Sequence, residues 1–321
     1  MVVNAKHAQA PLAWRCAAGT RVAAVIQYPL GVGNVVTRVL ESGVGPRTVL
    51  CLHGAGSRAD RWAPVVEPLA ATGYRVLALD FPGHGLATKG PTVPCTTPAL
   101  SDFVAEALDA LGLGEVDVLG TSLGGHVGAT LATRRPGLVR SLVLVGAVGI
   151  VEFPLHLQRD PKLLSEASPT AIRRKLEVLV ADRSLVTDAW VREESMINSS
   201  PGAAESLRRI GEYLNDGLNG DLVGALLRDR EPLPTLLVWG ADDVWVPPEH
   251  GRATQVALPG TQFVLMERCG HAPYFERPQR FVEIVGPFLG DGHIDLGADY
   301  VMSATGKEQQ DIMSATGKEQ P

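Results

Sequence analysis

Short apolar runs alternate with longer segments of helical spacing along most of the chain. The runs lack polar alternation, as expected for strands covered on both faces of a sheet. The expected strands are Thr48–Leu52, Arg75–Leu79, Val116–Leu119, Ser141–Val145, Thr235–Trp239 and Gln262–Met266. Between them, segments such as Ser101–Leu113 and Gly124–Arg134 repeat apolar residues at helical intervals. The alternation predicts an α/β fold in which a mostly parallel sheet carries helices on both faces.

Two stretches depart from this alternation. Near the N-terminus, strand-like segments around Val22–Tyr28 and Asn34–Glu41 are separated by the turn formers Pro29, Gly31 and Gly33. Between Val145 and Thr235 no convincing core strand occurs, and residues 168–227 have mainly helical patterns with many charges. We therefore expect a core made of residues 1–150 and 231–290, with residues 151–230 inserted as a helical cap. Ligands bind outside the carboxyl ends of strands in open α/β sheets, so an insertion leaving there is placed over the site.

The last residues, 291–321, have a different character. The octapeptide MSATGKEQ occurs at 302–309 and again at 313–320. Two polar copies cannot form a solenoid, which needs at least about three stacked units. Their composition predicts a disordered tail or an expression remnant.

Composition excludes several classes of function. The chain has 321 residues, of which 45% are hydrophobic, so a sizeable core can be buried. With a net charge of −6 and no Lys/Arg-rich run, nucleic acid is not expected as a partner. The apolar runs are too short to span a bilayer, and the N-terminus lacks the pattern of a secretory signal. The four cysteines show no metal-like spacing. These features fit a cytoplasmic protein acting on a small molecule, and a homo-oligomer is compatible with them.

The strongest chemical signal is the sequence Gly120-Thr121-Ser122-Leu123-Gly124. It follows an expected strand directly and precedes a helical segment. This is the G-x-S-x-G nucleophile elbow in its required context, because the sharp turn needs positions almost free of side chains around the serine. The turn exposes the Ser122 hydroxyl above the sheet, at the positive end of the next helix.

A serine hydroxyl needs an adjacent base to act as a nucleophile. His271 has the best context, because it follows the last expected strand and completes the chain order Ser, Asp, His. The acid that orients the imidazole should follow an earlier strand, and Asp242 and Asp243 both do. Spacing from Gly240 favours Asp243. Glu152, after the strand that ends near Val148, is a rival acid.

The oxyanion of an acyl-transfer reaction needs backbone donors. One is expected from the N–H of Leu123, the residue after the serine. The other is expected from the loop His53-Gly54-Ala55-Gly56-Ser57, with Ala55 as the donor. We interpret His53 mainly as a residue that fixes this loop, and His84 as part of a tight turn. His126 is expected to pack against the sheet.

These motifs together resemble the α/β-hydrolase superfamily over about residues 34–290. The resemblance rests on His53-Gly54, Asp80-x-Pro82-Gly83-His84-Gly85, Gly120-x-Ser122-x-Gly124-Gly125, Gly240-x-x-Asp243-x-x-x-Pro247 and Gly270-His271-x-Pro273-x-x-Glu276-x-Pro278. It implies the α/β-hydrolase fold, an eight-stranded, mostly parallel sheet flanked by helices with a helical cap inserted after the sixth strand. It also implies a triad of Ser122, Asp243 and His271, with no metal or organic cofactor.

Within the superfamily, the stretch from Leu176 to Thr187 resembles the cap of the meta-cleavage-product hydrolases, which break carbon–carbon bonds. Those enzymes usually carry a cap arginine that binds the substrate carboxylate, whereas Glu194 stands at the matching position and Arg192 lies nearby. They also usually have Trp where this chain has Ala272, and Asn where it has Thr121.

Acidic residues at the pocket would disfavour an anionic substrate. With Glu193 and Glu194 placed there, we predict hydrolysis of an ester, lactone or amide through an acyl-enzyme. Substrate contacts are expected from His53, Gly54, Thr121 and Trp245.

Other functions stay open at this point. One alternative is hydrolysis of a carbon–carbon bond, as in the meta-cleavage-product hydrolases. Another is a non-catalytic ligand receptor on the same scaffold, although such a receptor has no need of a histidine beside an exposed serine. A cofactor-free oxygenase that uses only the histidine and aspartate is a fourth interpretation.

Overall fold

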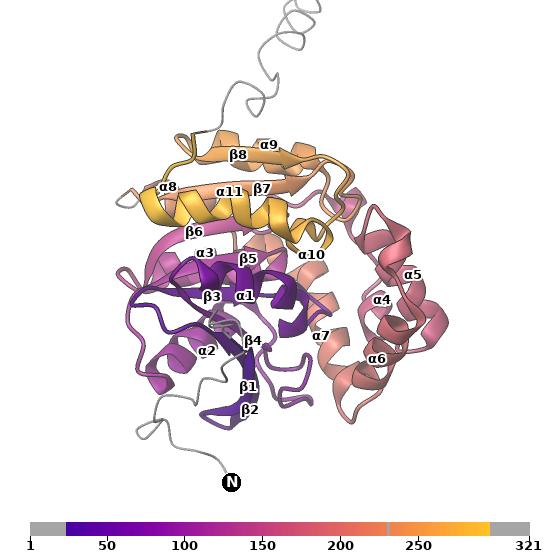
Figure 1. The fold of residues 1–321 in the computed structure, drawn as a ribbon. Helices are drawn as coiled ribbons and strands as arrows, with labels where there is room; N and C mark the ends of the chain where they lie inside the picture. Colours follow the sequence, from indigo (N-terminus) through magenta and orange to yellow (C-terminus); the bar gives the residue numbers. More distant parts are fainter. Residues whose placement is uncertain (1–23, 230–231, 296–321) are drawn as a thin grey trace, which may run out of the picture.

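The computed structural model describes residues 24–229 and 232–295, which form an eight-stranded sheet flanked by helices (Figure 1). The strand order is β1-β2-β4-β3-β5-β6-β7-β8. The strands after β2 are β3 (Thr48–Leu52), β4 (Arg75–Leu79), β5 (Val116–Thr121), β6 (Val139–Val145), β7 (Thr235–Gly240) and β8 (Gln262–Met266). They run parallel, whereas β2 (Val35–Ser42) is antiparallel to both of its neighbours. The expected fold class is confirmed.

The N-terminal hairpin differs from the expectation. The first strand, β1, spans Ile26–Val32, so Pro29 and Gly31 lie within it and do not form the turn. The turn is the two residues after Val32, which pairs with Val35. A proline is tolerated at this place because β1 is an edge strand and one side of its backbone needs no partner.

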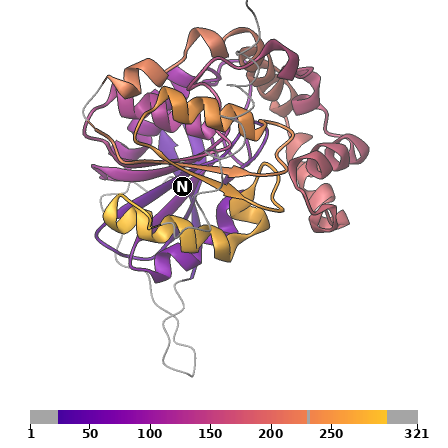
Figure 2. The same ribbon diagram turned by 90° about the horizontal axis from the view of Figure 1, so that it is seen from above.

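Each face of the sheet packs against its own layer of helices, and Figure 2 shows the two layers on either side of the strands. Leu50 and Leu52 of β3 contribute to the core beneath α2 (Thr97–Ala110) and α3 (Leu123–Arg134). Their neighbours Val49 and Cys51 point the other way and pack with the second layer. That layer includes η2 (Ala59–Trp62), α1 (Ala63–Ala71), α10 (Pro273–Glu276) and α11 (Pro278–Asp291). Burial on both faces explains why the strands read as continuous apolar runs.

Only helices lie between β6 and β7 in the described residues. They are η3 (Leu155–Leu157), α4 (Lys162–Ser165), α5 (Pro169–Leu179), η4 (Arg183–Leu185), α6 (Asp188–Asn198), α7 (Ala203–Asp216), η5 (Leu218–Gly220) and α8 (Gly224–Arg228). Helices α4 to α7 project to one side of the sheet in Figure 1. Six buried residues between α5 and α6, among them Ile172 and Trp190, form a small core of their own. Helix α8 instead packs on α3 and on α9 (Pro248–Ala257).

The described chain ends just after α11. Ile294 is buried there, and its backbone bonds to the Gln262 side chain through both N–H and C=O. The repeated octapeptides, and with them the expected disordered tail, lie outside the described residues. Among the residues the structure describes, no helix combines the length and apolar character needed to cross a membrane.

Candidate active site

Ser122 occupies a strained turn between β5 and α3. Its φ of 52° and ψ of −120° place a non-glycine residue in a region that side chains rarely adopt. A Cβ atom on Gly124 would lie 2.3 Å from the Leu52 carbonyl oxygen, and one on Gly120 would lie 2.4 Å from that of Gly124. Both positions therefore require glycine. The turn holds the Ser122 side chain clear of the sheet at the N-terminus of α3, as the elbow motif predicts.

His271 and Asp243 form a buried pair on two neighbouring loops. The Nδ1 atom of His271 lies 2.7 Å from Oδ2 of Asp243. The other carboxylate oxygen, Oδ1, accepts hydrogen bonds from the backbone N–H groups of Trp245 and Val246, both at 2.9 Å. The carboxylate is thus fixed by its own loop while it orients the imidazole.

Backbone bonds between the loops bring this pair together. After β7, the N–H groups of Ala241 and Asp242 donate to the carbonyls of Met266 and Cys269, at 2.9 Å each. The N–H of His271 donates to the carbonyl of Leu179 in α5, at 2.8 Å. Asp242 is exposed, as expected of a solvated loop residue, and so is the rival acid Glu152. The geometry therefore favours Asp243 over both as the partner of His271.

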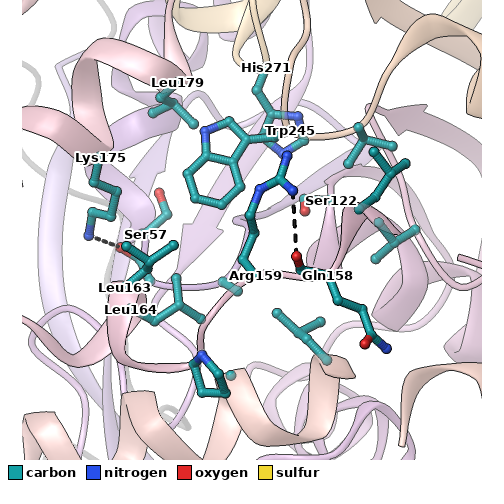
Figure 3. A pocket seen from close by; sticks show the side chains of 18 of the residues that line it. Ser57, Ser122, Gln158, Arg159, Leu163, Leu164, Lys175, Leu179, Trp245 and His271 are labelled. Atoms are coloured by element: carbon teal, nitrogen blue, oxygen red, sulfur yellow. Dashed lines mark hydrogen bonds between the residues drawn. The ribbon is translucent and has the colours of Figure 1, made fainter. Parts of the chain in front are cut away.

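Ser122 and His271 line one cavity of about 130 Å³, together with Trp245 and Ala55. Figure 3 shows the serine, the imidazole and the indole of Trp245 close together, with Lys175 and Ser57 at the opposite side. Within the described part of the chain, no hydrogen bond joins the Ser122 hydroxyl to the His271 ring. Catalytic contacts are often loose until a substrate is bound. The cavity is thus a place where a carbonyl carbon could approach Ser122 with the imidazole beside it.

The two expected oxyanion donors lie around the same serine. Leu123 is the first residue of α3, and Ala55 is part of the cavity wall. Across the described residues, neither backbone N–H has a hydrogen-bond partner. Gly54 is so close that a Cβ atom there would lie 3.2 Å from the Cβ of Ser122. The arrangement leaves two donors for an oxygen of a ligand.

Three buried histidines serve the structure. The Nε2 atom of His53 accepts from the Phe81 N–H at 2.9 Å, and burial lowers the pKa of this histidine to about 4. His84 bonds to the Pro82 carbonyl at 3.1 Å. His126 bonds to Thr97 and to the carbonyl of Asp221, so it joins α3 to the helical segment after β6. His53 is not part of the cavity wall, so its position does not support a substrate contact.

Thr121 is also absent from the cavity wall. It is 2% exposed and is the last residue of β5, directly before Ser122. Of the expected substrate contacts, Trp245 lines the cavity and Gly54 adjoins Ser122.

The two acidic residues do not give the pocket a negatively charged wall, so our expectation that they would disfavour an anionic substrate was wrong. Glu194 does line the cavity, but it is paired with Arg58 at 2.5 Å and Arg61 at 3.0 Å, and Lys175 lies 3.7 Å away. Glu193 points outward with its side chain 58% exposed and pairs with Arg58. The sequence led us to expect two acidic residues at the pocket. Their basic partners belong to segments that are distant in the chain, and helical periodicity does not show that these segments meet. The wall is not a source of uncompensated negative charge.

Two residues at the site were not expected. Arg159, in the segment between η3 and α4, extends toward Trp245 and Ser122 in Figure 3. Among the described residues, no carboxylate lies within ion-pair distance of its guanidinium. A Cβ atom on Gly146, directly after β6, would lie 3.0 Å from Nδ1 of His271. A glycine after a strand end was a usable signal, whereas nothing in the pattern marks Arg159.

Known proteins share this arrangement of the chain. The model of a family described as alpha/beta hydrolase fold matches residues 47–278. A 2-hydroxy-6-oxononadienedioate/2-hydroxy-6-oxononatrienedioate hydrolase from Cupriavidus pinatubonensis is 31% identical over 271 residues, 78% of this chain and 89% of that protein. The dihydrolipoyllysine-residue acetyltransferase component of an acetoin cleaving system from Cupriavidus necator is 31% identical over 275 residues, 85% of this chain and 71% of that protein.

A solved structure gives the same result for the fold. The meta-cleavage product hydrolase from Pseudomonas fluorescens superposes with a TM-score of 0.74 at 24% identity, covering 83% of this chain and 98% of that one. The two curated relatives have different activities at equal identity, so similarity alone does not assign a substrate. The family pattern nevertheless spans more than half of the sequence and includes the elbow and both loops of the buried pair. The chain belongs to the α/β-hydrolase family of enzymes.

Proposed function

We propose that this chain is a serine hydrolase that cleaves an ester, lactone or amide of a small molecule through an acyl-enzyme. Ser122 is the nucleophile, His271 the general base and Asp243 the acid that orients it. The observation that carries the proposal is the 2.7 Å contact between His271 and Asp243 beside a cavity that also holds the strained Ser122. A ligand-binding protein has no need of this combination.

The reaction follows from the positions of these groups. The His271 imidazole takes the hydroxyl proton of Ser122 as the oxygen attacks the carbonyl carbon. The oxygen of the tetrahedral intermediate accepts hydrogen bonds from the N–H groups of Leu123 and Ala55. The leaving group takes the proton from His271, and water activated by the same base releases the acid. In this proposal the expected cap, residues 151–230, selects the substrate, and its helices α5 and α6 contribute Lys175 and Glu194 to the cavity wall.

Hydrolysis of a carbon–carbon bond is the second candidate. It is favoured by the Cupriavidus pinatubonensis relative, which by its name acts on dienedioates. It is also favoured by Arg159, which could bind the carboxylate of such a compound inside the cavity. Ala272, Thr121 and Glu194 count against it, because meta-cleavage enzymes usually have other residues at those positions.

Labelling with a fluorophosphonate tests the nucleophile. The reagent should modify the wild-type protein at Ser122, and Ser122→Ala should remove both labelling and at least about 10³-fold of the turnover of an accepted ester. A folded wild-type protein that does not react would support the receptor interpretation instead. More than a tenth of the wild-type rate in Ser122→Ala would reject the mechanism.

The bond that is cleaved can be tested separately. A series of p-nitrophenyl esters and matched amides would be compared with a yellow ring-fission product whose colour disappears on cleavage. If the chain is an ester, lactone or amide hydrolase, kcat/KM should be larger for an ester than for the ring-fission product. Loss of colour without ester turnover would establish the carbon–carbon reaction in its place.

A further inference from the structure

Three cations surround the carboxylate of Glu194 in the cavity wall. Arg58 and Arg61, from the loop and turn after β3, donate to Oε2 at 2.5 and 3.0 Å. Lys175, from α5, lies 3.7 Å from Oε1. Glu194 itself comes from α6 and is 2% exposed. The core and two inserted helices therefore meet at one buried anion.

The carboxylate is ionised in this setting. Burial raises the pKa of Glu194, but the nearby charges of Arg61, Lys175 and Arg58 outweigh it and hold that pKa below its usual value. Arg61 also stacks against the indole of Trp190, with its guanidinium carbon 4.2 Å from the ring centroid. The cations are therefore held in place by more than Glu194 alone.

Polar atoms at the same wall are left without partners. The Nε of Arg61 and the hydroxyl of Ser57 are buried, and the described residues offer neither a hydrogen-bond partner. Both residues line the cavity, as do Lys175 and Glu194. A buried donor without a partner is rare in folded proteins. These atoms point to a ligand group at this place.

We propose that Arg58, Arg61 and Lys175 form a carboxylate-binding site that is already occupied by the protein's own Glu194. This wall of the cavity therefore receives an uncharged polar part of the substrate. The inference rests on the proposed function, because it takes the cavity to be the substrate site. With Glu194 in place, Arg61 and Lys175 already face a carboxylate, so a second carboxylate finds no unpaired cation at this wall. A carbonyl or hydroxyl of a neutral substrate can instead bond to Ser57 and to the free donor of Arg61.

Replacement of the internal carboxylate tests this proposal. Glu194→Gln keeps the shape but removes the charge, so benzoate should bind at least about tenfold more tightly than to wild type, as expected for charge-assisted hydrogen bonds. Benzamide, the neutral analogue, should bind equally to both proteins. Glu193→Gln is the matched control, since Glu193 pairs with the same Arg58 outside the cavity. Isothermal titration calorimetry measures each affinity without any turnover, so failure of the proposed function would not affect the result.

A buried cluster can fail to fold when one charge is removed. The double variant Glu194→Gln, Lys175→Met removes one charge of each sign and keeps both arginines, so its affinity for benzoate should lie between those of wild type and Glu194→Gln. A gain in Glu194→Gln that is unchanged by Lys175→Met would place the anion elsewhere and overturn the proposal. An equal gain for benzamide, or none for benzoate, would also overturn it.

Discussion

The loops at the strand ends and the wall of inserted helices hold their side chains in different ways. Asp243 is fixed by two backbone N–H groups of its own loop, and Ser122 by a turn that only its neighbouring glycines permit. Glu194 is instead fixed by side chains from η2, α5 and the loop after β3. One region is built from local backbone geometry and the other from long-range pairs of charges.

This difference separates reaction from specificity. Local backbone geometry places a nucleophile and a base to within fractions of an ångström and tolerates little change. Pairs of long side chains can be exchanged for other pairs, so the same core can receive different substrates. The two relatives that share 31% identity with this chain and differ in activity fit that division.

Loss of the orienting carboxylate should have the largest effect. Asp243→Asn keeps the shape of the loop but favours the wrong tautomer of His271, so kcat should fall about 10⁴-fold. Steady-state kinetics on an accepted ester would measure it. Asp242→Asn is the matched control, because Asp242 is exposed and neighbours the same loop. A loss of less than tenfold in Asp243→Asn would show that the local pair does not govern the reaction.

Acid should unfold the core over a defined range. Burial lowers the pKa values of His53, His126 and His250 to about 4 and of His84 to about 3, from about 6.5 in the unfolded chain. Between those values the unfolded state binds more protons, so this part of the stability is complete above pH 6.5 and is lost toward pH 4. Each histidine contributes up to about 1.4 kcal/mol per pH unit. Urea unfolding at pH 7 and pH 5 should differ by at least about 3 kcal/mol.

A variant at one buried histidine tests whether these residues cause the loss of stability in acid. His126→Asn keeps a polar side chain at this place but cannot titrate, so the stability of the variant should depend less steeply on pH. If the unfolding free energy were constant from pH 7 to pH 5, the histidines would not be neutral groups in the fold.

Crowding at the elbow should have the next effect. A Cβ atom on Gly124 would meet the carbonyl oxygens of Leu52 and His53 at 2.3 and 2.5 Å, so Gly124→Ala must shift the turn that holds Ser122. A shift of about 1 Å is expected to cost about 10²-fold in kcat/KM. Gly286→Ala is the control, because a Cβ atom there meets nothing within 4 Å. Unchanged kinetics in a folded Gly124→Ala protein would contradict the account of the turn.

The sequence predicted the local region well. Strand ends, the elbow and the two loops are each encoded within a few residues, and β3, β4 and β8 have the predicted bounds. His271 and Asp243 meet because the parallel strands β7 and β8 pair side by side, which the alternation of strand and helix already implied.

The ion pairs around Glu194 in the cavity wall could not be predicted in the same way. Glu194 was seen as an acid at the pocket, but its cations lie more than a hundred residues away at Arg58 and Arg61, or on another helix at Lys175. Helical periodicity shows which face of a helix is buried but not which neighbour covers it. The net charge of a wall therefore depends on packing that a single sequence does not display.

Substitution of Arg159 should have the smallest effect, and it should affect only substrates that carry a negative charge. The guanidinium of Arg159 reaches the cavity from an exposed segment. Among the residues that the structure describes, its partners are backbone carbonyls, at 3.5 Å in Gln158 and 3.3 Å in Val244. A substrate carboxylate would find it unpaired, so Arg159→Gln should raise KM for an acidic substrate about tenfold and leave that for a neutral ester unchanged. Arg183→Gln, an exposed arginine outside the cavity wall, is the control. The value of kcat should stay constant, because the substitution does not move Ser122 or His271. Equal changes in KM for both substrates would show that Arg159 shapes the entrance of the cavity without recognising charge.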